Sequence, residues 1–93
     1  MTNKKCVQLT VKGKVQGVFF RKFTKIKAEE LKIKGFVKNE LSGSVFIEAC
    51  GDGQNIDTFI EWCHHGPANA KVEKVTAEET ELKEFSSFQI NYF

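Results

Sequence analysis

The sequence predicts an α+β domain in which two amphipathic helices cover one face of an antiparallel sheet. Several segments alternate apolar and polar residues, which is typical of strands with one buried face, and two others repeat apolar residues with a helical period. They follow one another as strand, helix, strand, strand, helix, strand, the order of the ferredoxin-like split β-α-β fold. Because 93 residues suffice for one hydrophobic core and are too few for two, we expect a single domain over residues 1–93.

The first half of the chain supplies a strand, a helix and a hairpin. Residues 6–12 predict a strand whose inward face carries Val7, Leu9 and Val11. Residues 20–33 predict a helix whose apolar stripe carries Phe20, Phe23, Ala28 and Leu31. Strands at 35–39 and 44–50 flank a turn at 41–44, and the second of them turns Val45, Ile47 and Ala49 to one face. We expect the first and third strands to lie in the middle of the sheet.

The second helix has clear start and stop signals. Asp52 is a suitable N-cap, and Gly66 with Pro67 ends the helix near His65. Its apolar stripe carries Ile56, Phe59, Ile60 and Cys63. Two further β segments follow at 70–78 and 88–92, and the imperfect alternation of the first is consistent with a β-bulge.

The overall charge does not favour nucleic acids or membrane surfaces as partners. The chain has 14 basic and 12 acidic residues, a net charge of +2, which gives no reason to expect a nucleic acid or a membrane surface as partner. No apolar run follows the N-terminus, so we expect no signal peptide and no membrane span. Three cysteines without a C-x-x-C pair cannot all be bridged within the chain, and we interpret Cys6, Cys50 and Cys63 as buried thiols of a cytoplasmic protein.

The segment from Gly13 to Arg21 is the candidate binding site. Its two glycines, Gly13 and Gly17, lift the steric limits on the backbone, so that consecutive N–H groups can curl around an anion. The following helix start adds free N–H groups and partial positive charge, and Arg21 lies in its first turn. We therefore expect a phosphate or a similar oxyanion here. The alternative is an ordinary strand-to-helix loop with a surface arginine.

Other motifs carry weaker signals. No Gly-Lys-Ser/Thr closes the loop, which excludes a nucleotide-hydrolase phosphate loop. The adjacent His64 and His65 diverge on a helix and cannot share a metal ion, so we expect no metal site and no cofactor. Residues 34–37 resemble the start of the octamer of RNA-recognition domains, but the later aromatic positions are missing.

Three segments together resemble the signature blocks of the acylphosphatase family. They are residues 13–21, with Arg21, residues 35–39, with Asn39, and Gly66-Pro67 with the run from 70 to 75. The resemblance covers nearly the whole chain. It departs from the usual family pattern at Phe36, where tryptophan is common, and at Lys38, where arginine is common.

The resemblance implies an enzyme that hydrolyses the carboxyl-phosphate bond of small acyl phosphates to carboxylate and inorganic phosphate, without a metal. It implies that Arg21 and Asn39 are the catalytic residues. Arg21 can bind two phosphate oxygens, and Asn39 can orient water although it is no base. Phosphate is expected to bind Arg21 and the loop N–H groups of Val15, Gln16, Gly17, Val18 and Phe19. We expect a monomer. The alternatives are a non-catalytic acyl-phosphate or anion-binding module and a small RNA-binding domain.

Overall fold

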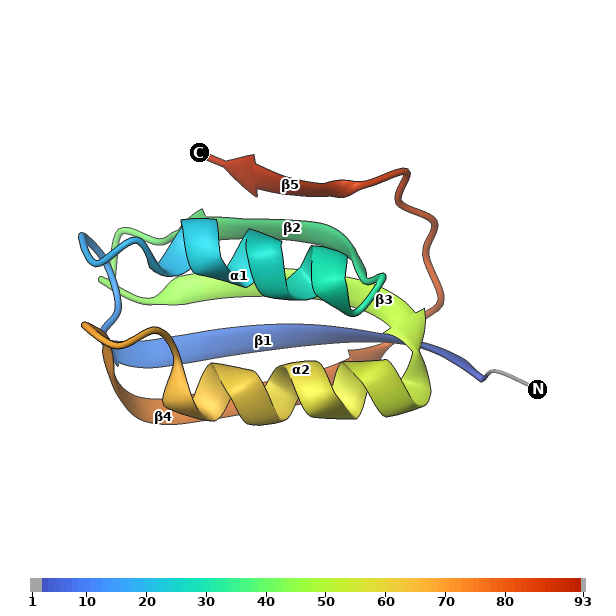
Figure 1. Cartoon of the computed structure of the whole chain (residues 1–93), viewed down its shortest axis with the longest axis horizontal. Helices are drawn as coiled ribbons and strands as arrows, with labels where there is room; N and C mark the ends of the chain where they lie inside the picture. Colours follow the sequence, from blue (N-terminus) through green and yellow to red (C-terminus); the bar gives the residue numbers. More distant parts are fainter. Residues whose placement is uncertain (1–2, 93) are drawn as a thin grey trace.

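The computed structural model describes residues 3–92, which form one sheet with two helices on one of its faces (Figure 1). The strands follow the order β4-β1-β3-β2-β5 across the sheet. The strands are β1 (Lys4–Lys14), β2 (Lys34–Asn39), β3 (Val45–Asp52), β4 (Lys71–Thr80) and β5 (Phe88–Asn91), and the helices are α1 (Phe20–Glu30) and α2 (Gly53–His65). The predicted ferredoxin-like α+β fold is confirmed, with β1 and β3 in the interior of the sheet.

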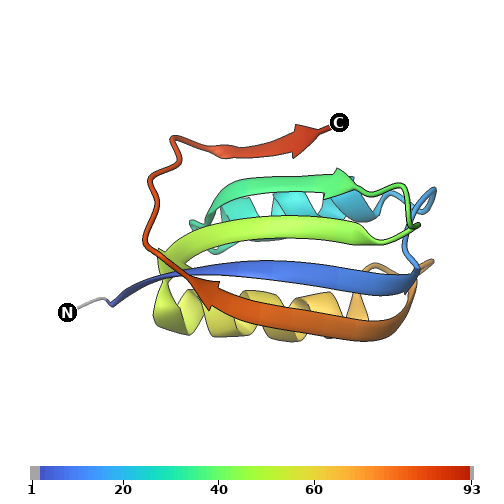
Figure 2. The same ribbon diagram turned by 180° about the vertical axis from the view of Figure 1, so that it is seen from behind.

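The sheet is mixed, which corrects the prediction of a fully antiparallel one. Strand β5 pairs with β2 in parallel, from Gly35 opposite Phe88 to Lys38 opposite Asn91. Strand β4 lies at the opposite edge, so the segment 81–87 has to cross from one side of the sheet to the other before β5 begins (Figure 2). That crossing returns the chain in the same direction as β2.

The core lies between the helices and the inward face of the sheet. The predicted inward residues of β1 and β3 are all buried, as are Ile56, Phe59 and Cys63 of α2. In α1 the prediction for Phe23 is wrong, because its side chain is 42% exposed while Thr24 is completely buried. The buried Thr24 hydroxyl donates to the carbonyl of Phe20 at 2.7 Å, which satisfies this polar group inside the core.

The predicted ends of α2 and the predicted bulge are confirmed, whereas α1 is shorter than predicted. The Asp52 carboxylate accepts a hydrogen bond from the Gln54 N–H at 3.1 Å, and α2 ends at His65, where the Gly66 N–H donates to the Trp62 carbonyl. Helix α1 ends at Glu30 and not at residue 33. The register between β1 and β4 shifts so that Glu73 has no partner in β1, which is the bulge suggested by the sequence.

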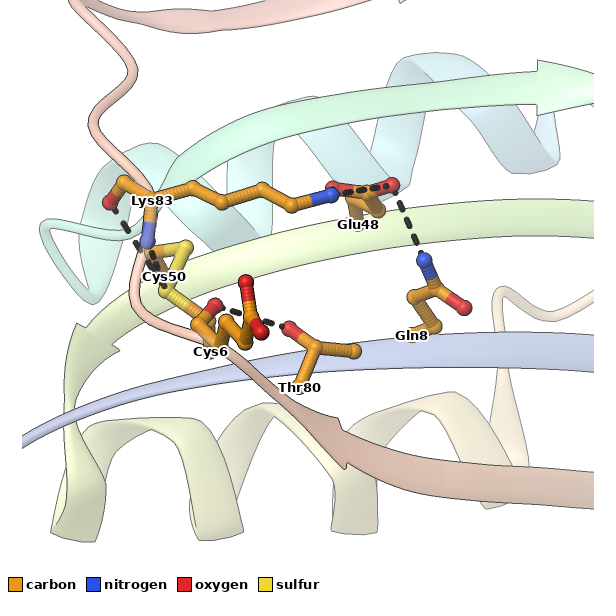
Figure 3. Close-up of polar contacts among 7 residues, drawn as sticks. Cys6, Gln8, Glu48, Cys50, Thr80 and Lys83 are labelled. Atoms are coloured by element: carbon orange, nitrogen blue, oxygen red, sulfur yellow. Dashed lines mark hydrogen bonds and ion pairs between the residues drawn. A yellow bond between two sulfur atoms is a disulfide. The ribbon is translucent and has the colours of Figure 1, made fainter.

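Two of the three cysteines form a disulfide, so the prediction of three thiols is wrong for Cys6 and Cys50 (Figure 3). These residues are direct partners in the β1–β3 register and lie on the sheet face away from the helices. The crossing segment covers them, and its Lys83 N–H donates to the Cys6 Sγ atom at 3.3 Å. Beside them, the buried Glu48 carboxylate pairs with the Lys83 ammonium at 3.1 Å and accepts from the Gln8 amide at 3.1 Å.

Within the described residues, neither helix has the length and apolar character needed to cross a membrane.

Candidate functional site

The segment between β1 and α1 has the irregular backbone that the glycine pattern predicts. Val15 is completely buried and anchors the start of the loop, while Gly17 and Phe19 both adopt positive φ angles, of 75° and 61°. None of the N–H groups from Val15 to Phe19 donates a hydrogen bond to another backbone group in residues 3–92. The loop therefore offers a run of unused donors, which suits an anion.

The start of α1 adds to the positive character of this loop. Phe19 occupies the N-cap position, and no side chain caps the helix. The first turn carries no acidic residue. The partial positive charge of the helix end is thus left uncompensated at the point where the loop enters the helix.

The Gln16 side chain joins the loop to the turn between β2 and β3. Its amide nitrogen donates to the carbonyls of Glu40 at 2.8 Å and of Ser44 at 2.9 Å. Asn39 is the last residue of β2, directly before this turn. The two hydrogen bonds therefore fix the position of the loop relative to Asn39.

Arg21 and Asn39 line the same cleft, which has a volume of about 280 Å³. The Arg21 guanidinium carbon lies 4.8 Å from the centre of the Tyr92 ring, a cation–π contact that fixes one face of the fork. No carboxylate of residues 3–92 forms an ion pair with Arg21. The Asn39 Oδ1 atom is buried and has no hydrogen-bond partner in the described chain. A buried acceptor without a donor is costly, so the Asn39 Oδ1 atom is available to a donor that enters the cleft.

The structure brings most of the predicted site residues together in one cleft, and four further residues also line it. Val15, Gly17, Phe19, Arg21 and Asn39 line the cleft, whereas Gln16 and Val18 are not part of its lining. Sequence reasoning missed four cleft residues, Phe20, Lys22, Ile90 and Tyr92. The last two come from the final β segment, which reaches the cleft only because β5 pairs with β2.

The other candidate groups lie outside this cleft. His64 and His65 are exposed at the end of α2. Cys63 is a free thiol in the core, and burial raises its pKa well above the usual range, which keeps it protonated and unreactive. No three side chains of the metal-binding types His, Cys, Asp and Glu cluster within residues 3–92.

Known proteins are similar to this chain in both sequence and fold. The family model described as Acylphosphatase matches residues 7–90. An acylphosphatase of Coxiella burnetii is 44% identical over 88 residues, which are 95% of this chain and 93% of that protein. A solved structure of an acylphosphatase from Coxiella burnetii, 44% identical, superposes with a TM-score of 0.93 over 96% of this chain and 94% of the other. The crystal structure of an acylphosphatase from Bacillus subtilis, which is 34% identical, superposes with a TM-score of 0.92 over 95% of this chain and 99% of the other.

The fold and the cleft thus define a small α+β domain in which a loop with unused backbone N–H groups lies beside an arginine. The chain belongs to the acylphosphatase family, as the resemblance in its sequence predicted.

Proposed function

We propose that this protein is an acylphosphatase, which hydrolyses the carboxyl-phosphate bond of small acyl phosphates without a metal ion. The observation that carries the proposal is the buried Oδ1 atom of Asn39, which has no hydrogen-bond donor among residues 3–92 and lies in the cleft that Arg21 also lines. An acyl phosphate already has a good leaving group. Its hydrolysis therefore asks the protein mainly for positioning and for stabilisation of charge.

The loop and Arg21 bind the phosphoryl group in this proposal. The N–H groups from Val15 to Phe19 have no backbone acceptor within residues 3–92 and are available to phosphate oxygens. The planar, positively charged fork of an arginine such as Arg21 can bind two phosphate oxygens at once. The stacked Tyr92 ring limits the motion of the fork, so that less conformational entropy is lost on binding.

Asn39 positions the attacking water. Its Oδ1 accepts a hydrogen bond from one O–H group of the water, and a lone pair of the water oxygen then attacks phosphorus from the side opposite the leaving group. As the new P–O bond forms, the bond from phosphorus to the carboxyl oxygen breaks, and the carboxylate leaves with the electron pair. The second proton of the water passes to a phosphate oxygen, because Asn39 is no base.

We also propose that the protein acts as a monomer, with no nucleic acid as partner and with inorganic phosphate as its product and ligand. The nearly balanced charge of the chain supports the absence of a nucleic-acid partner. A cytoplasmic location stays a prediction, and the disulfide between Cys6 and Cys50 removes the cysteine argument for it. Cell fractionation would test the cytoplasmic location, and a sedimentation measurement would test the monomeric state.

Hydrolysis of acetyl phosphate by the purified protein, with and without a chelator, tests the proposal. We expect equal rates of phosphate release in both samples. Phosphate binding without any hydrolysis would instead identify an anion-binding module. Loss of activity in chelator that a divalent ion restores would refute the metal-independent mechanism.

A further inference from the structure

Helix α1 contacts strand β5 through two side chains on one face of the helix. The Lys25 ammonium donates a hydrogen bond to the carbonyl of Phe88, the first residue of β5, at 2.8 Å. The Arg21 guanidinium carbon lies 4.8 Å from the ring centre of Tyr92, which directly follows β5. Because Arg21 and Lys25 are four residues apart, their side chains lie on the same face of the helix. The helix and the strand run in opposite directions, so this face reaches both ends of β5 (Figure 1).

Strand β5 has one neighbouring strand among residues 3–92. It is four residues long, lies at the edge of the sheet and pairs with β2. The Ser87 carbonyl accepts a hydrogen bond from the Gly35 N–H of β2 at 3.0 Å. Successive carbonyls of an extended chain point in opposite directions, so the Phe88 carbonyl points away from β2, toward the open edge. Lys25 therefore supplies the donor that a further strand would otherwise provide.

The position of the Tyr92 ring depends on the course of β5. The ring is 68% exposed, so packing in the core does not hold it in place. Phe88, at the other end of the strand, is buried and packs against Phe59, with the ring centres 6.2 Å apart. A strand whose first side chain is anchored can still change direction beyond that residue. The hydrogen bond from Lys25 also fixes the peptide group of Phe88, and thereby sets the direction in which the chain continues to Tyr92.

Tyr92 in turn contacts the residue that we propose to bind the phosphoryl group. Arg21 and Tyr92 both line the phosphate cleft, whereas Lys25 is not part of its lining. Lys25 can therefore act on the cleft through the groups that it contacts or through its charge. The Lys25 side chain is half-buried, and its ammonium lies 3.5 Å from the Glu29 carboxylate one turn further along α1, which limits its motion.

We propose that Lys25 is a positioning residue for phosphate binding, which fixes β5 against α1 and so keeps the Tyr92 ring on the Arg21 guanidinium. This inference rests on the proposed function, in which Arg21 binds the phosphoryl group. A fork that is already oriented loses less conformational entropy on binding, so the effect of Lys25 should appear in the affinity for phosphate. Lys27 is a matched control, since its ammonium pairs with Glu30 of the same helix, at 3.3 Å, and not with β5.

The experiment measures the binding of inorganic phosphate by calorimetry for the wild type, Lys25→Met, Lys25→Arg and Lys27→Met. Methionine keeps the apolar stem of lysine but cannot donate a hydrogen bond to the carbonyl. For Lys25→Met we expect the dissociation constant of phosphate to rise about threefold to tenfold, because the lost hydrogen bond is charge-assisted but partly exposed to solvent. Lys25→Arg, which can still donate, and Lys27→Met, which removes the same charge, should both stay within about twofold of the wild type.

A double variant separates positioning from a simple loss of positive charge. In Tyr92→Leu the ring that Lys25 positions is absent. Adding Lys25→Met to Tyr92→Leu should therefore weaken phosphate binding by less than about a further twofold. An effect of the Lys25 charge alone would persist at full size in the double variant.

Fully additive losses of phosphate binding from Lys25→Met and Tyr92→Leu would overturn the positioning role. Unchanged phosphate binding in Lys25→Met, or equal effects of Lys25→Met and Lys27→Met, would overturn it as well. Each of these results would leave the proposed activity intact. A wild type that neither binds phosphate nor hydrolyses acetyl phosphate would instead refute the proposed function itself.

Discussion

Removal of the Gln16 side chain should weaken both the fold and the catalytic site. In Gln16→Ala the loop loses its two hydrogen bonds to the carbonyls of Glu40 and Ser44. Neither carbonyl is left without a donor, because Glu40 O also accepts from the Gly43 N–H at 3.0 Å and Ser44 O from the Glu40 N–H at 2.8 Å. The loss is therefore limited to two neutral hydrogen bonds, about 1 to 3 kcal/mol in total.

This free energy should be visible in two measurements. Chemical denaturation gives the free energy of unfolding, and steady-state kinetics with acetyl phosphate gives kcat/KM. If the loss acts on the geometry between the loop and Asn39, kcat/KM falls by about 5-fold to 150-fold. Gln89→Ala on β5 is the control, since Gln89 is exposed and its side chain makes no hydrogen bond to any other residue of the segment 3–92. Equal unfolding free energies of Gln16→Ala and Gln89→Ala within about 0.5 kcal/mol, together with equal kcat/KM values, would refute a stabilising role of the two Gln16 hydrogen bonds.

Three further predictions concern single positions. Asn39→Ala should lower kcat by about two to three orders of magnitude while inorganic phosphate still inhibits. If phosphate inhibition weakened as much as kcat, Asn39 would instead be one of the residues that bind phosphate. Gly13→Ala should lower the free energy of unfolding by roughly 3 kcal/mol or more, because the new Cβ would lie 2.1 Å from the Lys71 carbonyl oxygen. In Gly17→Ala the new Cβ meets no atom within 4 Å, so only the φ of 75° is unfavourable, and the loss should be about 1 to 2 kcal/mol. Equal unfolding free energies of these two variants would contradict this. Burial raises the pKa of Cys63, so above about pH 8.5 the thiol ionises only in the unfolded state. The free energy of unfolding should therefore fall by up to about 1.4 kcal/mol per pH unit above that pH. A Cys63→Ala variant whose unfolding free energy fell equally steeply with pH would contradict this prediction.

The sequence predicts the elements of this fold because local patterns encode them. Alternation marks β1 and β3, and the Asp52 cap and Gly66 mark the two ends of α2. Hydrophobicity alone does not predict that Thr24, and not Phe23, is buried in the core. A threonine that donates to its own helix backbone can be buried, and it leaves the larger apolar ring at the surface.

Long-range contacts account for the other differences. Cys6 and Cys50 become partners only through the register of β1 with β3, which the spacing of the cysteines does not reveal. Tyr92 reaches Arg21 only because the final strand attaches in parallel beside β2. Gln16 illustrates the same limit within the site, since its backbone position was predicted while the contacts of its side chain depend on a turn more than twenty residues away.

Inhibition by inorganic phosphate of the wild type and of Arg21→Lys tests the central claim most directly. A lysine keeps the positive charge but is a point donor that cannot reproduce the two-point contact of the guanidinium fork. The loss of one charge-assisted hydrogen bond, about 1.5 to 3 kcal/mol, should weaken competitive inhibition by phosphate about 10-fold to 150-fold, with a comparable or larger loss of kcat/KM for acetyl phosphate. Unchanged phosphate inhibition in Arg21→Lys would show that Arg21 does not bind the phosphoryl group and would contradict the account of the site.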